Sequence, residues 1–252
     1  MTATNVAPSV GPGVYVIQGQ RVELPVVVRD ASSGAATYAV SAAAARKLLP
    51  NDDLELLEPW PGRALCSIAV IAYGDNDLGK YNEVSIAFFV RRRGTPRGLP
   101  FLGTVLDFMR GRAATYIRHL PVDGRFTCEA GRTIWGFPKT VEEIDFETEQ
   151  NRASCRLVMD GQHVLTLSLP RGGARRLPDS TMVTYSYIDG AVHATKFSSG
   201  GEGVGFHLGG AEVELGSHPI SQELRSLGLP KRALMTMWME KMRGRFEAAE
   251  RI

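Results

Sequence analysis

Two Asp-Gly dipeptides constrain the fold of this chain more than any other sequence feature. Asp160-Gly161 and Asp189-Gly190 each lie between two short runs of β-branched or alternating apolar residues. Both residues of such a dipeptide tolerate the positive φ of a two-residue turn, so each predicts an antiparallel hairpin. An antiparallel, β-rich body is therefore expected. The runs with strand character are residues 22–28, 65–73, 84–90, 155–159, 164–169, 182–188 and 192–197.

Helical patterns are fewer. An Ala-rich stretch at residues 41–49 stops at Pro50, and residues 102–109 carry apolar side chains at helical spacing. A third pattern follows Pro230, which suits the first turn of a helix. It predicts a C-terminal helix that packs on the body or on a neighbouring subunit, with a stripe formed by Leu234, Trp238, Met242 and Phe246.

Length and charge favour one domain with a small-molecule function. A chain of 252 residues fits a single barrel-like β domain spanning residues 1–252. Its formal net charge is only +2, and acidic and basic residues are spread along the whole chain. This pattern argues against binding nucleic acid. The N-terminus lacks a secretory pattern, and no apolar run approaches the roughly 20 residues that cross a bilayer. A cytoplasmic protein without membrane contact is expected.

Cysteine and histidine spacing predicts neither a disulfide framework nor a metal site. Cys66, Cys128 and Cys155 are odd in number and widely spaced, so we expect reduced thiols. The five histidines show no ligand spacing on a common face. The arginine-rich residues 91–100 are interpreted as a solvated loop at a strand end, and the glycine-rich residues 200–210 as a hairpin or loop without the context of a phosphate site. The histidines are His119, His163, His193, His207 and His218.

Lys139 is the candidate reactive residue among six lysines. It follows Trp135, Phe137 and Pro138. If this aromatic segment lines a pocket, poor solvation of the ammonium would lower its pKa, and only a neutral amine attacks a carbonyl. The alternative is a surface lysine whose stem packs on apolar neighbours.

A wider pattern resembles the acetoacetate decarboxylase-like superfamily. Gly131-Arg132 followed by Pro138-Lys139 is similar to the segment that carries this family's Schiff-base lysine. Further similar segments cover most of the chain. These are Arg21 through Arg29-Asp30, Leu48-Leu49-Pro50, Tyr81-Asn82-Glu83, His218-Pro219-Ile220 and Leu227-Gly228-Leu229-Pro230. The resemblance implies a mainly β, single-domain antiparallel barrel of that type, with a few peripheral helices and a C-terminal helix.

The resemblance also implies roles for individual residues. Lys139 would form an imine with a small keto acid, and Glu83 would exchange protons with the reacting carbon. Arg21 would hold the substrate carboxylate with its planar guanidinium, and Trp135 would contact the substrate. Without the resemblance, Glu83 is a polar residue at the start of a strand and Arg21 an exposed strand residue. No cofactor and no metal are expected, and relatives of this kind are typically homo-oligomers.

Three departures from the family pattern leave the reaction open. Thr140 replaces the second lysine of the family's pair, and simple counting puts Ile68 where decarboxylases carry a second glutamate. The stretch between Glu83 and Asp123 is also longer than in a typical decarboxylase. The leading hypothesis is decarboxylation of a 3-oxo acid through a lysine imine. The alternatives are an aldolase-dehydratase that uses pyruvate or a similar 2-oxo acid, and a non-catalytic barrel that binds a small molecule.

Overall fold

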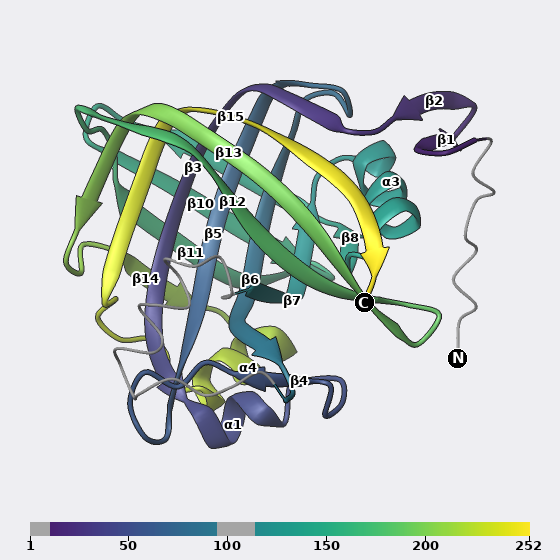
Figure 1. Cartoon of the computed structure of the whole chain (residues 1–252). Coiled ribbons are helices and arrows are strands. Elements are labelled where there is room, and N and C mark those ends of the chain that lie inside the picture. Colours follow the sequence, from purple (N-terminus) through teal and green to yellow (C-terminus); the bar gives the residue numbers. More distant parts are fainter. Residues whose placement is uncertain (1–10, 95–113) are drawn as a thin grey trace.

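A closed barrel of seven strands forms the centre of the molecule (Figure 1). The computed structural model describes residues 11–94 and 114–252, so the helical pattern at residues 102–109 lies outside it. The strands follow the order β6-β5-β3-β15-β13-β12-β7, and pairing of β7 with β6 closes the ring. Their bounds are β3 Val26–Ser41, β5 Arg63–Asn76, β6 Tyr81–Arg92, β7 Ala114–Val122, β12 Arg175–Ile188, β13 Ala191–His207 and β15 Met235–Arg251.

The barrel is mixed rather than wholly antiparallel. Six of its seven pairings are antiparallel, whereas β12 runs parallel to β7. A parallel pair needs a long connection, and here the chain between β7 and β12 includes a helix and several strands. The expected β-barrel is confirmed, with this one pairing as a correction to its expected antiparallel character.

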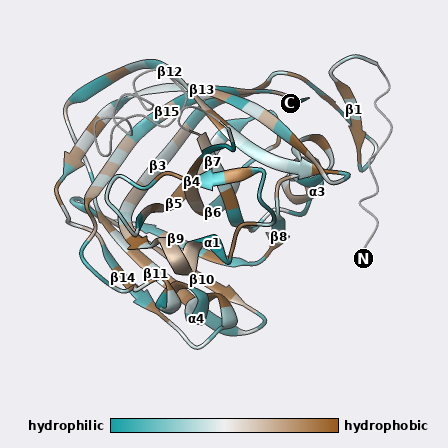
Figure 2. Cartoon of the chain, turned by 60° about the horizontal axis from the view of Figure 1, so that its bottom comes forward, coloured by the Kyte–Doolittle hydropathy of each residue, from teal (hydrophilic) through white to brown (hydrophobic). Residues whose placement is uncertain are grey.

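A second, four-stranded sheet packs against one side of the barrel. It has the order β14-β11-β10-β9, and Figure 2 shows it together with α4. Leucines of β10 and β11 are fully buried between the sheet and the barrel, and the Phe146 ring stacks on Trp238 of β15 at 6.5 Å. This packing forms one of the two hydrophobic cores. The bounds are β9 Glu143–Thr148, β10 Arg152–Met159, β11 Gln162–Pro170, β14 Glu212–Leu215 and α4 Pro219–Ser226.

Short peripheral elements complete the described chain. The Ala-rich segment forms α1, where Ser41 caps the helix by accepting a hydrogen bond from the Ala44 N–H at 3.3 Å. No helix among the described residues is long and apolar enough to cross a membrane. The remaining bounds are β1 Val14–Ile17, β2 Gln20–Glu23, α1 Ala42–Arg46, β4 Leu54–Leu56, α3 Arg125–Trp135 and β8 Lys139–Val141.

Both Asp-Gly hairpins are confirmed. Asp160 and Asp189 have φ of 51° and 50°, and the glycines that follow have φ of 70° and 75°. Positive φ at both central residues is the geometry that matches the twist of the flanking strands. The first turn joins β10 to β11, and the second joins β12 to β13.

The predicted C-terminal helix is wrong, because residues 235–251 form strand β15 between β3 and β13. A four-residue spacing is also a multiple of two, so it fits one face of a strand as well as a helix. Trp238 faces the second sheet, whereas Met237 and Met239 face the barrel interior. A register shift between Met239 and Met242 then turns Met242 to the interior as well.

The segment interpreted as a loop and the one interpreted as a hairpin or loop are both partly strand. Residues 200–207 belong to β13, and Arg91 and Arg92 end β6, with Arg91 paired to Glu55 at 3.2 Å. The glycines of β13 permit close contact between strands. A Cβ at Gly201 would lie 2.4 Å from the Lys241 carbonyl oxygen, so only glycine fits there without a shift.

The buried leucines between barrel and sheet offer a matched test of this packing. Leu167→Ala removes a fully buried side chain of β11 and is expected to lower the free energy of unfolding by about 2–5 kcal/mol. Leu208→Ala makes the same chemical change at a residue that is 84% exposed, and is expected to stay within about 0.5 kcal/mol of the parent. Urea unfolding measures both, and equal effects would contradict the described core.

Candidate active site

The turn after α3 brings Lys139 back against the helix that precedes it. Gly136 ends α3 in the left-handed conformation with φ of 63°, and the Phe137 N–H donates to the Gly131 carbonyl at 3.1 Å. Lys139 then begins β8, which pairs in parallel with β7. A Cβ at Gly131 would lie 2.6 Å from Lys139 Cδ, so glycine is what lets the lysine stem lie against the helix.

The Lys139 amine forms a buried ion pair with Glu83. Lys139 Nζ lies 2.8 Å from Glu83 Oε2, and only 4% and 9% of the two side chains are exposed. The amine also donates to Thr127 Oγ1 at 3.0 Å and lies 4.9 Å from the centre of the Tyr81 ring. The Tyr73 hydroxyl donates to the other carboxylate oxygen of Glu83 at 3.4 Å. Both charges are therefore paired and hydrogen-bonded, as buried charges must be.

This pair changes the expected electrostatics of the lysine. Burial lowers the pKa of Lys139, but the negative charge of Glu83, the proximity of Tyr81 and hydrogen bonds to both raise it, and the net pKa lies above the usual value. The expectation of a lowered pKa for Lys139 is therefore wrong. Burial and Glu83 also raise the pKa of Tyr73, which keeps its hydroxyl protonated as a hydrogen-bond donor.

The ion pair lines a cavity of about 320 Å³ inside the barrel. Trp135 also lines this cavity, and its ring stacks with that of Phe137 at 5.8 Å. The Trp135 Nε1–H donates to the Glu247 carbonyl at 2.8 Å, which fixes the ring against β15. Lys139, Glu83 and Trp135 thus share one cavity, although Glu83 lies in a different segment of the sequence from Trp135 and Lys139.

Arg21 lies outside this cavity. Its side chain is 67% exposed and pairs with Glu23 at 2.6 Å within the β1–β2 hairpin, a separate two-stranded sheet. The guanidinium is therefore not placed to hold the carboxylate of a substrate bound at Lys139. This corrects the role inferred for Arg21 from the family pattern.

The two substituted family positions also face away from the cavity. Thr140 is exposed on the face of β8 opposite Lys139, and Ile68 is fully buried in the core toward the second sheet. Ser67 and Ala69, on either side of Ile68, line the cavity instead. Among the described residues that line it, Lys139 and Glu83 are the only charged side chains.

Sequence reasoning missed several residues that shape the site. Tyr73, Tyr81 and Thr127 surround the ion pair, and Gly131 makes room for it. Strand alternation could have identified Tyr81, because it lies two residues before Glu83 and shares its face of the strand. The rings of Tyr73 and Tyr81 stack at 4.4 Å, a contact between strands that local sequence does not reveal.

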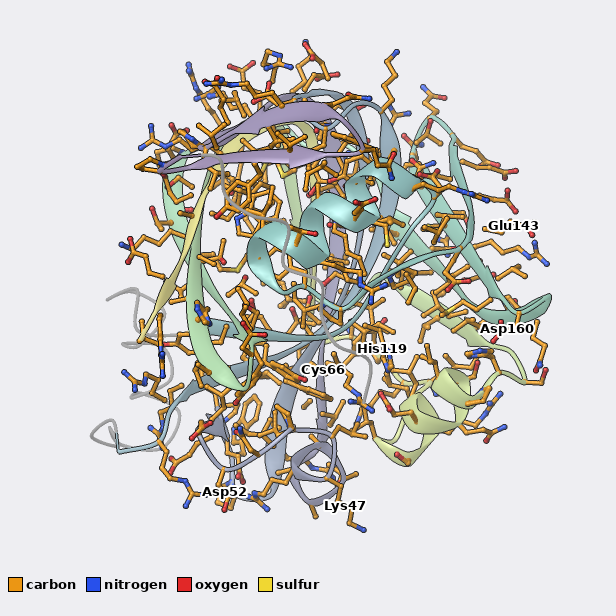
Figure 3. The ribbon with its side chains drawn as sticks, turned by 90° about the vertical axis from the view of Figure 1, so that its right-hand side faces the viewer. Lys47, Asp52, Cys66, His119, Glu143 and Asp160 are labelled. Carbon is orange, nitrogen blue, oxygen red and sulfur yellow. The ribbon has the colours of Figure 1, made fainter. Side chains whose placement is uncertain are left out.

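The histidines are not part of this site. His119, which Figure 3 labels, lies outside the cavity. Its Nε2 is hydrogen-bonded to Glu223 Oε1 of α4 at 2.8 Å. Within residues 11–94 and 114–252, no three His, Cys, Asp or Glu side chains are grouped to hold a metal ion.

Comparisons with known proteins identify the family. The family model of acetoacetate decarboxylase (ADC) matches residues 20–243, and the chain belongs to this family. A search of the curated proteins gave no match.

Solved structures share the fold at low sequence identity. An acetoacetate decarboxylase from Legionella pneumophila is 16% identical with a TM-score of 0.65, covering 98% of this chain and 91% of that one. The enduracididine biosynthesis enzyme MppR complexed with pyruvate is 15% identical with a TM-score of 0.59, covering 90% of each chain. An acetoacetate decarboxylase-like enzyme from Sphingomonas wittichii RW1 is 14% identical with a TM-score of 0.54, covering 93% and 96%.

Removing the carboxylate tests the electrostatic account of the pair. In Glu83→Gln, burial of the amine is no longer opposed by a negative charge, so the pKa of Lys139 is expected to fall below the usual value of about 10.4. The pKa is measured from the NMR chemical shift of the Lys139 Cε carbon as a function of pH, in protein with isotope-labelled lysine. Comparison with Lys139→Met assigns the signal. Glu129→Gln, at an exposed position of α3, is the control. A pKa that stays raised in Glu83→Gln would contradict the pairing.

Proposed function

We propose that this chain is a cofactor-independent carbon-carbon lyase that decarboxylates a 3-oxo acid through an imine on Lys139. The observation that carries this proposal is the Lys139 amine, buried within a barrel cavity 2.8 Å from the carboxylate of Glu83. Membership of the acetoacetate decarboxylase family supports it. In that family's namesake enzyme, lysine activation by its surroundings is already known.

Imine formation requires the amine to lose its proton, and Glu83 is in position to accept it. The pair is buried, so moving the proton from Lys139 to Glu83 replaces two buried charges with two neutral groups. The neutral Nζ then attacks the keto carbon and forms a carbinolamine. Protonated Glu83 returns the proton to the leaving hydroxyl, water departs, and the cationic imine is paired again with a carboxylate.

Carbon dioxide then leaves from the imine. The electrons of the breaking carbon-carbon bond move toward the imine nitrogen, which becomes a neutral enamine. A proton from the solvent adds to the carbon and restores the cationic imine, and water then hydrolyses it to a ketone and the Lys139 ammonium beside the Glu83 carboxylate. Throughout these steps the fixed carboxylate of Glu83 lies beside the nitrogen where positive charge appears and disappears.

The charge of the cavity favours loss of the carboxylate over its retention. The described lining contains no arginine and no lysine other than Lys139. A substrate carboxylate enclosed there without a cationic partner is unfavourable, and its departure as neutral carbon dioxide relieves that cost. A pyruvate-using aldolase would keep this carboxylate bound through its reaction. That alternative rests on the similarity of fold to MppR complexed with pyruvate.

Reductive trapping separates these reactions. Borohydride is added with acetoacetate, longer 3-oxo acids or pyruvate, and intact mass and released carbon dioxide are measured. Decarboxylation is expected to give carbon dioxide and an adduct with the mass of the ketone-derived alkyl group. Pyruvate chemistry would give an adduct that retains the carboxyl group.

Two lysine variants control the trapping. Lys139→Ala is expected to abolish the adduct, whereas Lys196→Ala, at a side chain 52% exposed, is expected to leave it unchanged. Absence of an adduct with every acid would support a barrel that only binds its ligand. An adduct that persists in Lys139→Ala would overturn the assignment of the reactive amine.

Gly131 provides a test that leaves both reacting residues in place. In Gly131→Ala the new methyl group meets Lys139 Cδ and Cε, the flexible part of the side chain, so the amine is displaced from Glu83. The trapping rate is expected to fall at least about tenfold, because small misplacements in active sites carry large penalties. Unfolding free energy is expected to change by no more than about 1 kcal/mol. Gly11→Ala, where a Cβ meets nothing, is the matched control.

A further inference from the structure

Part of the interior wall of the barrel beyond the ion pair consists of two rows of small side chains. Ala35, Ala69 and Ser85 form one row across β3, β5 and β6, and Thr37, Ser67 and Ala87 form the next row. Interiors of small barrels are ordinarily filled by side chains. These rows leave the space unfilled, and the cavity extends along the barrel from the site described above.

The cavity has a buried reactive end and a partly exposed end. The residues around the amine are buried, whereas Met182 and Met235 line the cavity with 45% and 42% of their surface exposed. On β6, the lining positions after Glu83 are Ser85 and Ala87, with small side chains, and then Phe89. Four residues of extended strand span about 13 Å. A ligand that fills the cavity therefore has its reactive carbonyl at one end and a chain reaching toward the methionines.

The wall beside the small residues is apolar and adaptable, because Met235 and Met237 of β15 pair with Thr37 and Ala35 of β3. Methionines of β15 line it together with Met182 of β12, and their unbranched side chains adjust to ligands of varied shape. The polar groups along the small-residue rows are hydroxyls, with no charge beyond the ion pair among the described lining. The methionines of β15 are Met235, Met237, Met239 and Met242.

Size and polarity together select a class of substrate. At about 320 Å³ the cavity reaches the range of roughly 300–1,000 Å³ that holds drug-sized ligands. Acetoacetate or pyruvate bound at Lys139 would leave the rows of small residues without a partner. An extended apolar chain fills that space and gains from leaving water.

We propose that the substrate is a 3-oxo acid with an extended apolar chain on its keto side, which lies along Ala35 and Ala69 toward Met235. This inference rests on the proposed lysine chemistry and names its substrate class. It predicts selectivity for chain length, because a methylene that fits well in an apolar pocket can raise kcat/KM by about tenfold.

The test compares straight-chain 3-oxo acids of increasing length, by carbon dioxide release, in three proteins. In the parent, kcat/KM is expected to rise at least about tenfold from acetoacetate to the best longer acid. Ala69→Leu obstructs the middle of the cavity and is expected to lower kcat/KM for the longer acids at least about tenfold. Its loss on acetoacetate is expected to be smaller than its loss on the longer acids, and urea unfolding shows separately that the variant is folded. Ala43→Leu, on the exposed side of α1, is the matched control.

Two results would overturn the substrate class while leaving the imine chemistry intact. One is equal or better use of acetoacetate by the parent, and the other is an equal loss for short and long acids in Ala69→Leu. Should no acid form an adduct, the chemistry fails, and calorimetric binding of butyrate and decanoate tests the cavity separately. Tighter binding of decanoate that Ala69→Leu removes would support the apolar channel, and equal binding of both acids would refute it.

Discussion

The ion pair between Lys139 and Glu83 depends on the closure of the barrel. Each buried charge carries a desolvation penalty of several kcal/mol that only its partner and hydrogen bonds offset. Glu83 lies on β6 and Lys139 on β8, and β7 pairs with both strands. Thr127 of α3 supplies one further hydrogen bond. The site therefore forms only when β6, β7, β8 and α3 are assembled, which couples the chemistry to the whole fold.

The barrel interior has two parts, the end that holds the ion pair and a channel beyond it. Close to β8, aromatic and charged side chains fill the space and hold the amine away from water. Beyond them, small side chains on β3, β5 and β6 leave a channel that methionines of β12 and β15 border. In the proposed function, reactivity and substrate length are therefore set by different residues. Substitutions in the channel can change the substrate without disturbing the ion pair.

Features that depend on local patterns, such as turns, were predictable from the sequence. Features that depend on strands pairing across the barrel were not. Both Asp-Gly turns were predictable, because turn chemistry is local. Lys139 was recognised by its resemblance to a family segment, but its raised pKa depends on Glu83, which is 56 positions earlier in the chain. The C-terminal helix was wrong because a spacing of four fits both structures, and only pairing with β3 and β13 decides between them. Arg21 was assigned by a family motif, whereas in the structure it lies on the separate β1–β2 hairpin, whose residues do not line the cavity.

The most direct test of this account is a crystal structure of the chain after borohydride reduction with a long-chain 3-oxo acid. Continuous density from Lys139 Nζ, with the nitrogen beside Glu83 and the alkyl chain running past Ala69 toward Met235, is the expected result. Density on a different lysine, or an alkyl chain outside the barrel, would contradict the central claim that one buried amine and one apolar channel define the function.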